Sequence, residues 1–143
     1  MPSISHGWDE FRSYCELYAN LGDEMSAIYD LHVAACSIYL ARAHVGAAED
    51  QIEALVAQYR IGLERLADDC PGRHTLVYPT FLVAMESKSA EFQQYFANAL
   101  LAFYQYLGFA NVLKALDYLA GYWADPGNTD WTRLCTGFDV FVF

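Results

Sequence analysis

The sequence predicts an all-α protein, a single bundle of about six helices followed by a short extended tail at the C-terminus. Apolar residues recur at every third or fourth position, which is the spacing of helices that bury one face. Glycine, proline and helix-capping residues interrupt that spacing and divide the chain into helices of ordinary length. Because 55% of the 143 residues are apolar and 18% are charged, the chain is too hydrophobic to be disordered. A chain of this length can bury a core without disulfides or metals, so we expect one domain over residues 1–143.

The first third of the chain predicts two helices. Residues 8–21 form the first, and Gly22 is placed to close it. The second runs from residue 23 to Gly46 and opens on two acidic residues, which suit a helix N-terminus. We expect this second helix to turn one stripe toward the core, made of Met25, Ile28, Tyr29, His32, Cys36, Tyr39, Leu40 and Ala43.

Two further helices are expected in the middle of the chain. The third starts near Ala48 and stops before residues 68–72, where two acidic residues and a Pro-Gly pair form a firm break. The fourth, residues 75–87, is apolar on nearly every side, which is typical of a helix at the centre of a bundle. Pro79 lies within its first turns, where a missing N–H does least harm.

Capping residues define the last two helices. Ser89 is a good N-cap for the fifth helix, which extends to Gly108. The sixth helix includes residues 112–123 and stops at the Asp-Pro-Gly sequence of residues 125–127. Beyond it we expect a short turn and then an extended apolar end, residues 138–143, that packs back on the bundle.

The charge of the chain disfavours two classes of partner. The net charge is −10, from 18 acidic residues against 8 basic ones, and the basic residues are not clustered. Since binding a nucleic-acid backbone requires clustered cations, we expect no direct nucleic-acid contact, and no membrane binding for the same reason. The chain starts without a signal segment, and no stretch reaches the ~20 apolar residues of a membrane span. We therefore expect a cytoplasmic or nuclear protein.

The cysteines and the known catalytic motifs predict no metal and no cofactor. The spacings between the four cysteines, 21, 34 and 65 residues, match no CxxC or zinc-finger pattern. Cysteines inside helices usually behave as small hydrophobic residues. The chain also lacks a P-loop, a dinucleotide fingerprint, a GxSxG sequence and an HExxH sequence.

The second half of the chain carries a more specific pattern. Residues 74–87 read HTLVYPTFLVAMES, a polar–aromatic helix follows, residues 107–112 read LGFANV, and an Asp-Trp pair stands at residues 130–131. This resembles the C-terminal part of the fungus-specific regulatory domain of zinc-cluster transcription factors. In that family an aromatic-Pro-x-Phe-x-x-x-x-Glu helix is followed by Leu-Gly-x-x-Asn and a closing Asp-Trp. The resemblance covers roughly Leu76 to Phe143.

The resemblance implies a helical regulatory domain, and the chain also departs from the family. The family's regulators carry a six-cysteine zinc cluster near the N-terminus, and this sequence has neither that motif nor a basic region around it. We therefore expect a stand-alone module without a DNA-binding half. The start at Met1 and the end at Phe143 carry no tag or linker, which favours a natural short protein over an excised fragment.

Two side chains are candidates for acid–base catalysis. His32 titrates near neutral pH and lies one helical turn from both Tyr29, a proton donor, and Cys36, whose thiol it could activate. The alternative is a core histidine bonded to a hydroxyl or carbonyl. Glu86 ends an apolar helix, where an ionised carboxylate needs a partner. It is either a catalytic carboxylate or, as its place in the family motif implies, bonded to a neighbouring helix.

Two hypotheses about function follow. The first is a regulatory or protein-interaction module derived from a transcription factor, which binds a second copy of the chain or a transcription-factor partner. The second, which we favour on the sequence alone, is a protein of fungal specialised metabolism that binds a hydrophobic small molecule. It would act as a cofactor-independent cyclase or isomerase, with His32 and Glu86 as catalytic residues. The predicted pocket is aromatic and consists of Tyr29, Cys36, Tyr39, Tyr78, Phe81 and Phe103.

Overall fold

The computed structural model describes residues 4–43, 48–108 and 110–125, and in these ranges it contains helices and connecting turns but no strand. This confirms the all-α prediction. The expected turn and extended end beyond residue 125 lie outside the described residues. In chain order the elements are α1 (Ile4–Ala43), α2 (Glu49–Arg65), the 3₁₀ helix η1 (Arg73–Leu76), α3 (Val77–Met85), α4 (Ala90–Leu107) and α5 (Asn111–Ala124).

The first two expected helices are one. Helix α1 is continuous over 40 residues, so the expected break at Gly22 is wrong. A glycine ends a helix when its backbone turns to a positive φ, as Gly108 does at the end of α4 with a φ of 72°. Gly22 has no such φ and stays within the helix, where it costs only about 1 kcal/mol relative to alanine.

The boundaries marked by capping residues were predicted well. The hydroxyl of Ser89 accepts a hydrogen bond from the Phe92 backbone N–H at 3.2 Å and so caps α4. The break after α2 is present, and Gly72 carries a φ of 83° within it. The expected fourth helix is divided into η1 and α3, and Pro79 lies in the first turn of α3 as expected.

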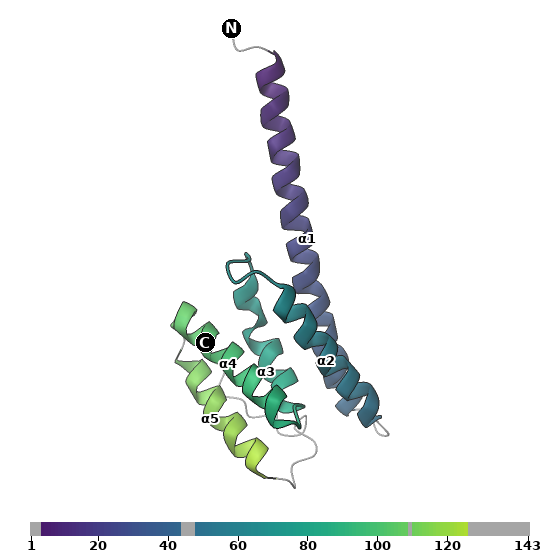
Figure 1. The fold of residues 1–143 in the computed structure, drawn as a ribbon, viewed down its shortest axis with the longest axis vertical. Coiled ribbons are helices and arrows are strands. Elements are labelled where there is room, and N and C mark those ends of the chain that lie inside the picture. Colours follow the sequence, from purple (N-terminus) through teal and green to yellow (C-terminus); the bar gives the residue numbers. More distant parts are fainter. Residues whose placement is uncertain (1–3, 44–47, 109, 126–143) are drawn as a thin grey trace.

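Helix α3 lies at the centre of the bundle. It packs against α1, α4 and α5, and all its residues except Tyr78 are buried. Around it, α2 packs on the C-terminal half of α1, and α5 packs on α4 (Figure 1). The N-terminal half of α1 extends well beyond the other helices (Figure 1). The other helices therefore pack only against the second half of α1.

The buried face of α1 differs from the expected stripe. The core side of the helix is formed by Ile28, Leu31, Ala35 and Ile38, each less than 5% exposed. Of the residues that we expected to face inward, Ile28 is buried, Tyr39 packs against the core and His32 is half-buried, as expected. The prediction was wrong for Met25, Tyr29, Cys36, Leu40 and Ala43, which are exposed. A Cβ added at Gly62 of α2 would lie 2.8 Å from Leu31 Cδ2, which shows how closely the two helices approach. Small residues on both helices permit this approach, and it selects the slimmer face of α1 for the core.

Candidate functional site

The two expected catalytic residues lie apart. His32 is on α1 and Glu86 follows α3, where its carboxylate binds Arg42, ten residues along α1 from His32. Ten residues of helix span about 15 Å. The structure therefore gives these two side chains separate surroundings.

The ring of His32 is held by a hydroxyl. Its Nε2 lies 3.1 Å from Oγ1 of Thr75, and this hydroxyl donates its own proton to the backbone oxygen of Gly72 at 2.7 Å. Because the hydroxyl proton is already used, Thr75 accepts at Oγ1, and the imidazole donates from Nε2. This contact attaches α1 to η1. The bond to a hydroxyl agrees with the structural alternative for His32, but His32 is half-buried and Thr75 is exposed, so the pair lies at the edge of the core.

Glu86 is buried and paired with an arginine from another helix. Its side chain is 2% exposed, and its two oxygens accept hydrogen bonds from Nε of Arg42 at 2.9 Å and from Nη2 at 2.7 Å. A bidentate pair of this kind compensates the burial of a carboxylate. The structure thus confirms a bond from Glu86 to a neighbouring helix.

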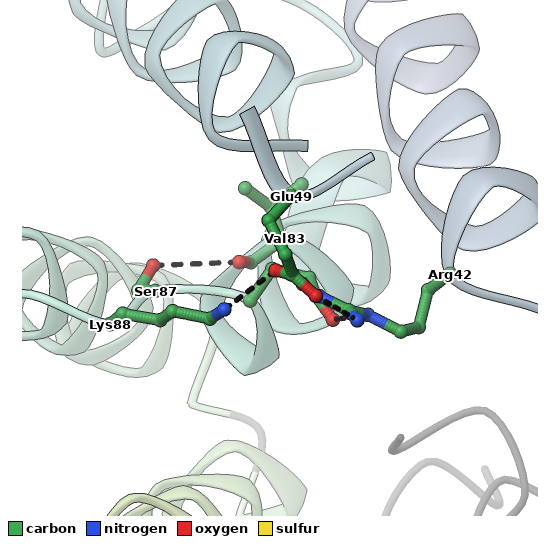
Figure 2. Close-up of polar contacts among 6 residues, drawn as sticks. Arg42, Glu49, Val83, Ser87 and Lys88 are labelled. Carbon is green, nitrogen blue, oxygen red and sulfur yellow. Dashed lines mark hydrogen bonds and ion pairs between the residues drawn. The ribbon is translucent and has the colours of Figure 1, made fainter. Parts of the chain in front are cut away.

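The same arginine extends the contact into a charged network at the end of the bundle. Arg42 also donates from Nη1 and Nη2 to the carboxylate of Glu49, at 2.6 and 2.9 Å, and Lys88 binds Glu49 at 2.6 Å (Figure 2). Hydrogen bonds from Arg42 and then Lys88 lower the pKa of Glu49 to about 2, and Glu49 and Glu86 raise the pKa of Arg42. The network joins α1, the start of α2 and the end of α3. Helical periodicity does not identify Arg42 as the partner of Glu86 or place Glu49 in the network, because these partners of Arg42 are 44 and 7 residues away.

Two buried hydroxyls form a further polar contact in the core. The Tyr59 hydroxyl lies 2.8 Å from Oγ1 of Thr80, and both side chains are fully buried. Burial raises the pKa of the Tyr59 phenol, so the group is neutral at physiological pH. The contact satisfies two polar groups in an apolar core and offers no acid or base.

The expected pocket residues do not surround a common cavity. Phe81 and Phe103 are buried in the core, Tyr39 is half-buried, and Tyr29, Cys36 and Tyr78 are exposed. Phe103 lines the cavity that is described next, and the other five residues do not line that cavity.

A cavity of about 490 Å³ lies between α4 and the loop that follows α2. Phe103 and Tyr106 form its α4 side. Cys70 of the loop and Arg73 and His74 of η1 are among the residues that line the other side. The Arg73 guanidinium lies 5.6 Å from the centre of the Phe103 ring. Burial raises the pKa of the Cys70 thiol, which makes it a poor nucleophile. We call this the α4 cavity; its size is that of a small-molecule site.

The outward side of α1 carries a row of exposed apolar residues. These are Phe11, Met25, Tyr29, Val33 and Leu40, which are 60, 54, 67, 45 and 66% exposed, together with the exposed Cys36. At about 100° per residue, all six lie within an arc of about 80° on the helix, roughly opposite the core face. We call this row the outer stripe. Four of its members, Met25, Tyr29, Cys36 and Leu40, were expected in the core. The sequence signal for their exposure is the second apolar face of α1, which includes Leu31, Ala35 and Ile38.

The described residues show neither a metal-ligand group nor a membrane span. Within them, no three His, Cys, Asp or Glu side chains are close enough together to hold a metal ion. No helix in the described part of the chain is long and apolar enough to cross a membrane.

Comparison with known proteins gives one match. A family described as "Fungal specific transcription factor domain" matches residues 4–143. The match reaches well upstream of Leu76 and therefore includes α1 and α2 as well as the part that carries the sequence motif. No match is found among curated proteins or among solved structures.

Proposed function

Because the chain belongs to the family of fungal specific transcription factor domains, we propose that it is a regulatory module that acts by binding another protein through the outer stripe of α1. The stripe carries this proposal. Large apolar side chains exposed on one side of a helix are unusual on a protein that works alone, and they mark an interaction surface.

The charges support a role that does not involve direct contact with DNA. The chain has a net charge of −10, and Arg42, Arg60 and Lys88 are each paired with a glutamate. These cations are not available to displace counterions from a phosphate backbone. On this proposal the protein works in the nucleus or the cytoplasm and reaches DNA only through its partner.

A reporter assay tests the proposal. The full chain is fused to a heterologous DNA-binding domain, and reporter transcription is compared with that of the DNA-binding domain alone. We expect the fusion to change transcription, the Tyr29→Glu/Leu40→Glu double variant to lose the effect, and Ile61→Glu to keep it. Ile61 is a matched control, since it is 50% exposed but lies on α2. An unchanged reporter with the wild-type fusion would contradict the proposal.

A second candidate function is the binding of a hydrophobic effector in the α4 cavity. The cavity volume of about 490 Å³ and the rings of Phe103 and Tyr106 favour it. Neither His32 nor Glu86 lines this cavity, and both side chains are occupied by structural bonds. We therefore propose binding there and not a cyclase or isomerase reaction.

Deletion of the gene separates the two functions. Transcripts of the controlled genes and the metabolite profile are measured in the same cultures of the fungus. A change in transcripts supports the regulatory function. Constant transcripts with accumulation of one intermediate would instead support a biosynthetic role and would refute regulation.

A further inference from the structure

We propose that the partner of the outer stripe is a second copy of this chain, and that two α1 helices pack along each other. This inference rests on the regulatory function proposed above and specifies its partner. The steps of the argument are the length of the stripe, its spacing, its charges and its area.

The length of the outer stripe favours a second copy of α1 as the partner helix. The outer stripe runs from Phe11 to Leu40, which is about 43 Å of helix. Helices α2, α4 and α5 have 17, 18 and 14 residues, so each is shorter than the stripe. Among the described elements only α1, with 40 residues, matches its length. A second copy therefore brings an element of the right size.

The N-terminal half of α1 also needs such a contact. This half extends beyond the bundle (Figure 1), and its described side chains between Asp9 and Asp23 are exposed. A single helix of about 20 residues that contains a glycine is marginal in water, because most helical stability comes from packing of an apolar face. A second α1 lying along it supplies that packing.

The spacing of the stripe is that of a two-helix coiled coil. Tyr29, Val33, Cys36 and Leu40 follow one another at intervals of four, three and four residues, and Phe11 lies fourteen residues, or two heptads, before Met25. A repeat of 3.5 residues keeps one seam facing a partner helix over many turns.

The charges of α1 permit two copies to meet despite the acidic chain. Asp9, Glu16 and Asp23 lie about 120° or more from the centre of the outer stripe, on the assumption of about 100° per residue. The buried face of α1 is also roughly opposite the stripe, so the rest of the bundle does not obstruct a partner. Most of the negative charge is thus kept away from the contact.

The exposed area is sufficient for a dimer at the small end of the usual range. Large side chains have areas of about 150–250 Å², so the five largest members of the stripe expose roughly 500 Å² per copy. Two copies then bury on the order of 1,000 Å² or more, which is the lower limit for specific association. We expect a reversible dimer.

Sedimentation of the full chain tests this inference over protein concentrations of about 1–100 µM. We expect the mass to rise from that of one 16.1 kDa chain to twice that value. Tyr29→Glu and Leu40→Glu should each raise the dissociation constant at least about tenfold, because they place a charge in an apolar contact. Ile61→Glu should leave it unchanged. Thermal unfolding followed by circular dichroism checks that every variant keeps a cooperatively folded bundle.

Several results would overturn the inference. These are a wild-type chain that remains a monomer at the highest concentration, stripe variants that dimerise as well as the wild type, or an equal loss in Ile61→Glu. A monomer whose reporter activity still depends on Tyr29 and Leu40 would refute the second copy as partner while leaving the regulatory function intact. A chain that dimerises through the stripe but has no reporter activity would refute the regulatory function and leave the dimer intact.

Discussion

The Glu86 side chain shows how one buried charge fastens two distant parts of the chain. It is the only ionisable side chain that is buried among the described residues apart from Tyr59, Tyr122 and Cys70, and Arg42 provides its counter-charge. The exposed pair between Arg60 and Glu64 is chemically similar but lies on the surface of α2. The two pairs therefore compare a buried, bidentate glutamate–arginine pair with an exposed pair joined by one hydrogen bond.

We expect Glu86→Ala to lower the free energy of unfolding by about 2–3 kcal/mol, because it leaves a partly buried guanidinium with only one carboxylate. Glu64→Ala should lower it by less than about 1 kcal/mol, because solvent screens an exposed pair. Urea denaturation of both variants measures the difference. Equal effects would mean that the Glu86 contact behaves as a surface ion pair.

Glu49 should make the stability depend on acidity. Its pKa is about 2 in the folded protein and 4.5 in its ordinary state, so between these values the unfolded chain binds more protons. The free energy of unfolding should therefore fall as the pH drops from about 4.5 toward 2. Because Glu49 is half-exposed, we expect its share to be less than about 1 kcal/mol.

Urea titrations at several pH values between 5 and 2 measure this share as the difference between the wild type and Glu49→Gln. The difference should be largest at the upper end of the range and disappear near its lower end. Asp50→Asn is the control, since Asp50 is the exposed neighbour of Glu49. A difference that stays constant with pH would show that Glu49 is not held by its cations.

At the level of the element, the continuity of α1 through Gly22 is the most testable feature. No atom lies within 4 Å of a Cβ added at Gly22, and its backbone has no positive φ. Gly22→Ala should therefore stabilise the helix by about 0.5–1 kcal/mol and raise its helical content. Gly108→Ala should destabilise the protein, because Gly108 has a φ of 72° at the end of α4.

Circular dichroism and thermal unfolding of the two alanine variants measure these opposite effects. If Gly22→Ala were instead as harmful as Gly108→Ala, Gly22 would be ending a helix and α1 would consist of two shorter pieces.

At the level of the whole molecule, a continuous α1 makes the protein elongated. The 40 residues of α1 are about 60 Å long. A compact chain of this size has a radius of gyration of about 14–15 Å, so α1 is about four times as long as that radius. Small-angle X-ray scattering should give a maximum dimension of at least about 60 Å. A compact particle would show that the N-terminal half of α1 folds back on the bundle.

The dimer and the elongated shape are linked through the same helix. A projecting helix is stabilised by a partner along its length, so variants that separate the copies should also weaken the helix. In the proposed dimer the amount of ordered α1 would depend on protein concentration, which would give regulation by association a physical basis.

The sequence by itself determined the helical class and those boundaries that depend on local chemistry. The Ser89 cap, the Gly108 stop and the position of Pro79 involve only neighbouring residues, and the structure contains all three. The family motif was also readable, because it lies within one stretch of the chain. Periodicity further predicted that the C-terminal half of α1 is a helix with apolar residues at helical spacing.

Only the tertiary structure decided which side of α1 is inside and what surrounds Glu86 and His32. Helix α1 has two apolar faces, and close packing on α2 selects the slimmer one, so Tyr29 faces outward although periodicity allows either face. Arg42 and Thr75 lie 44 and 43 residues from the side chains that they bind. Such contacts arise only when helices pack, because the spacing along one helix reports its own faces and not the atoms that will cover them.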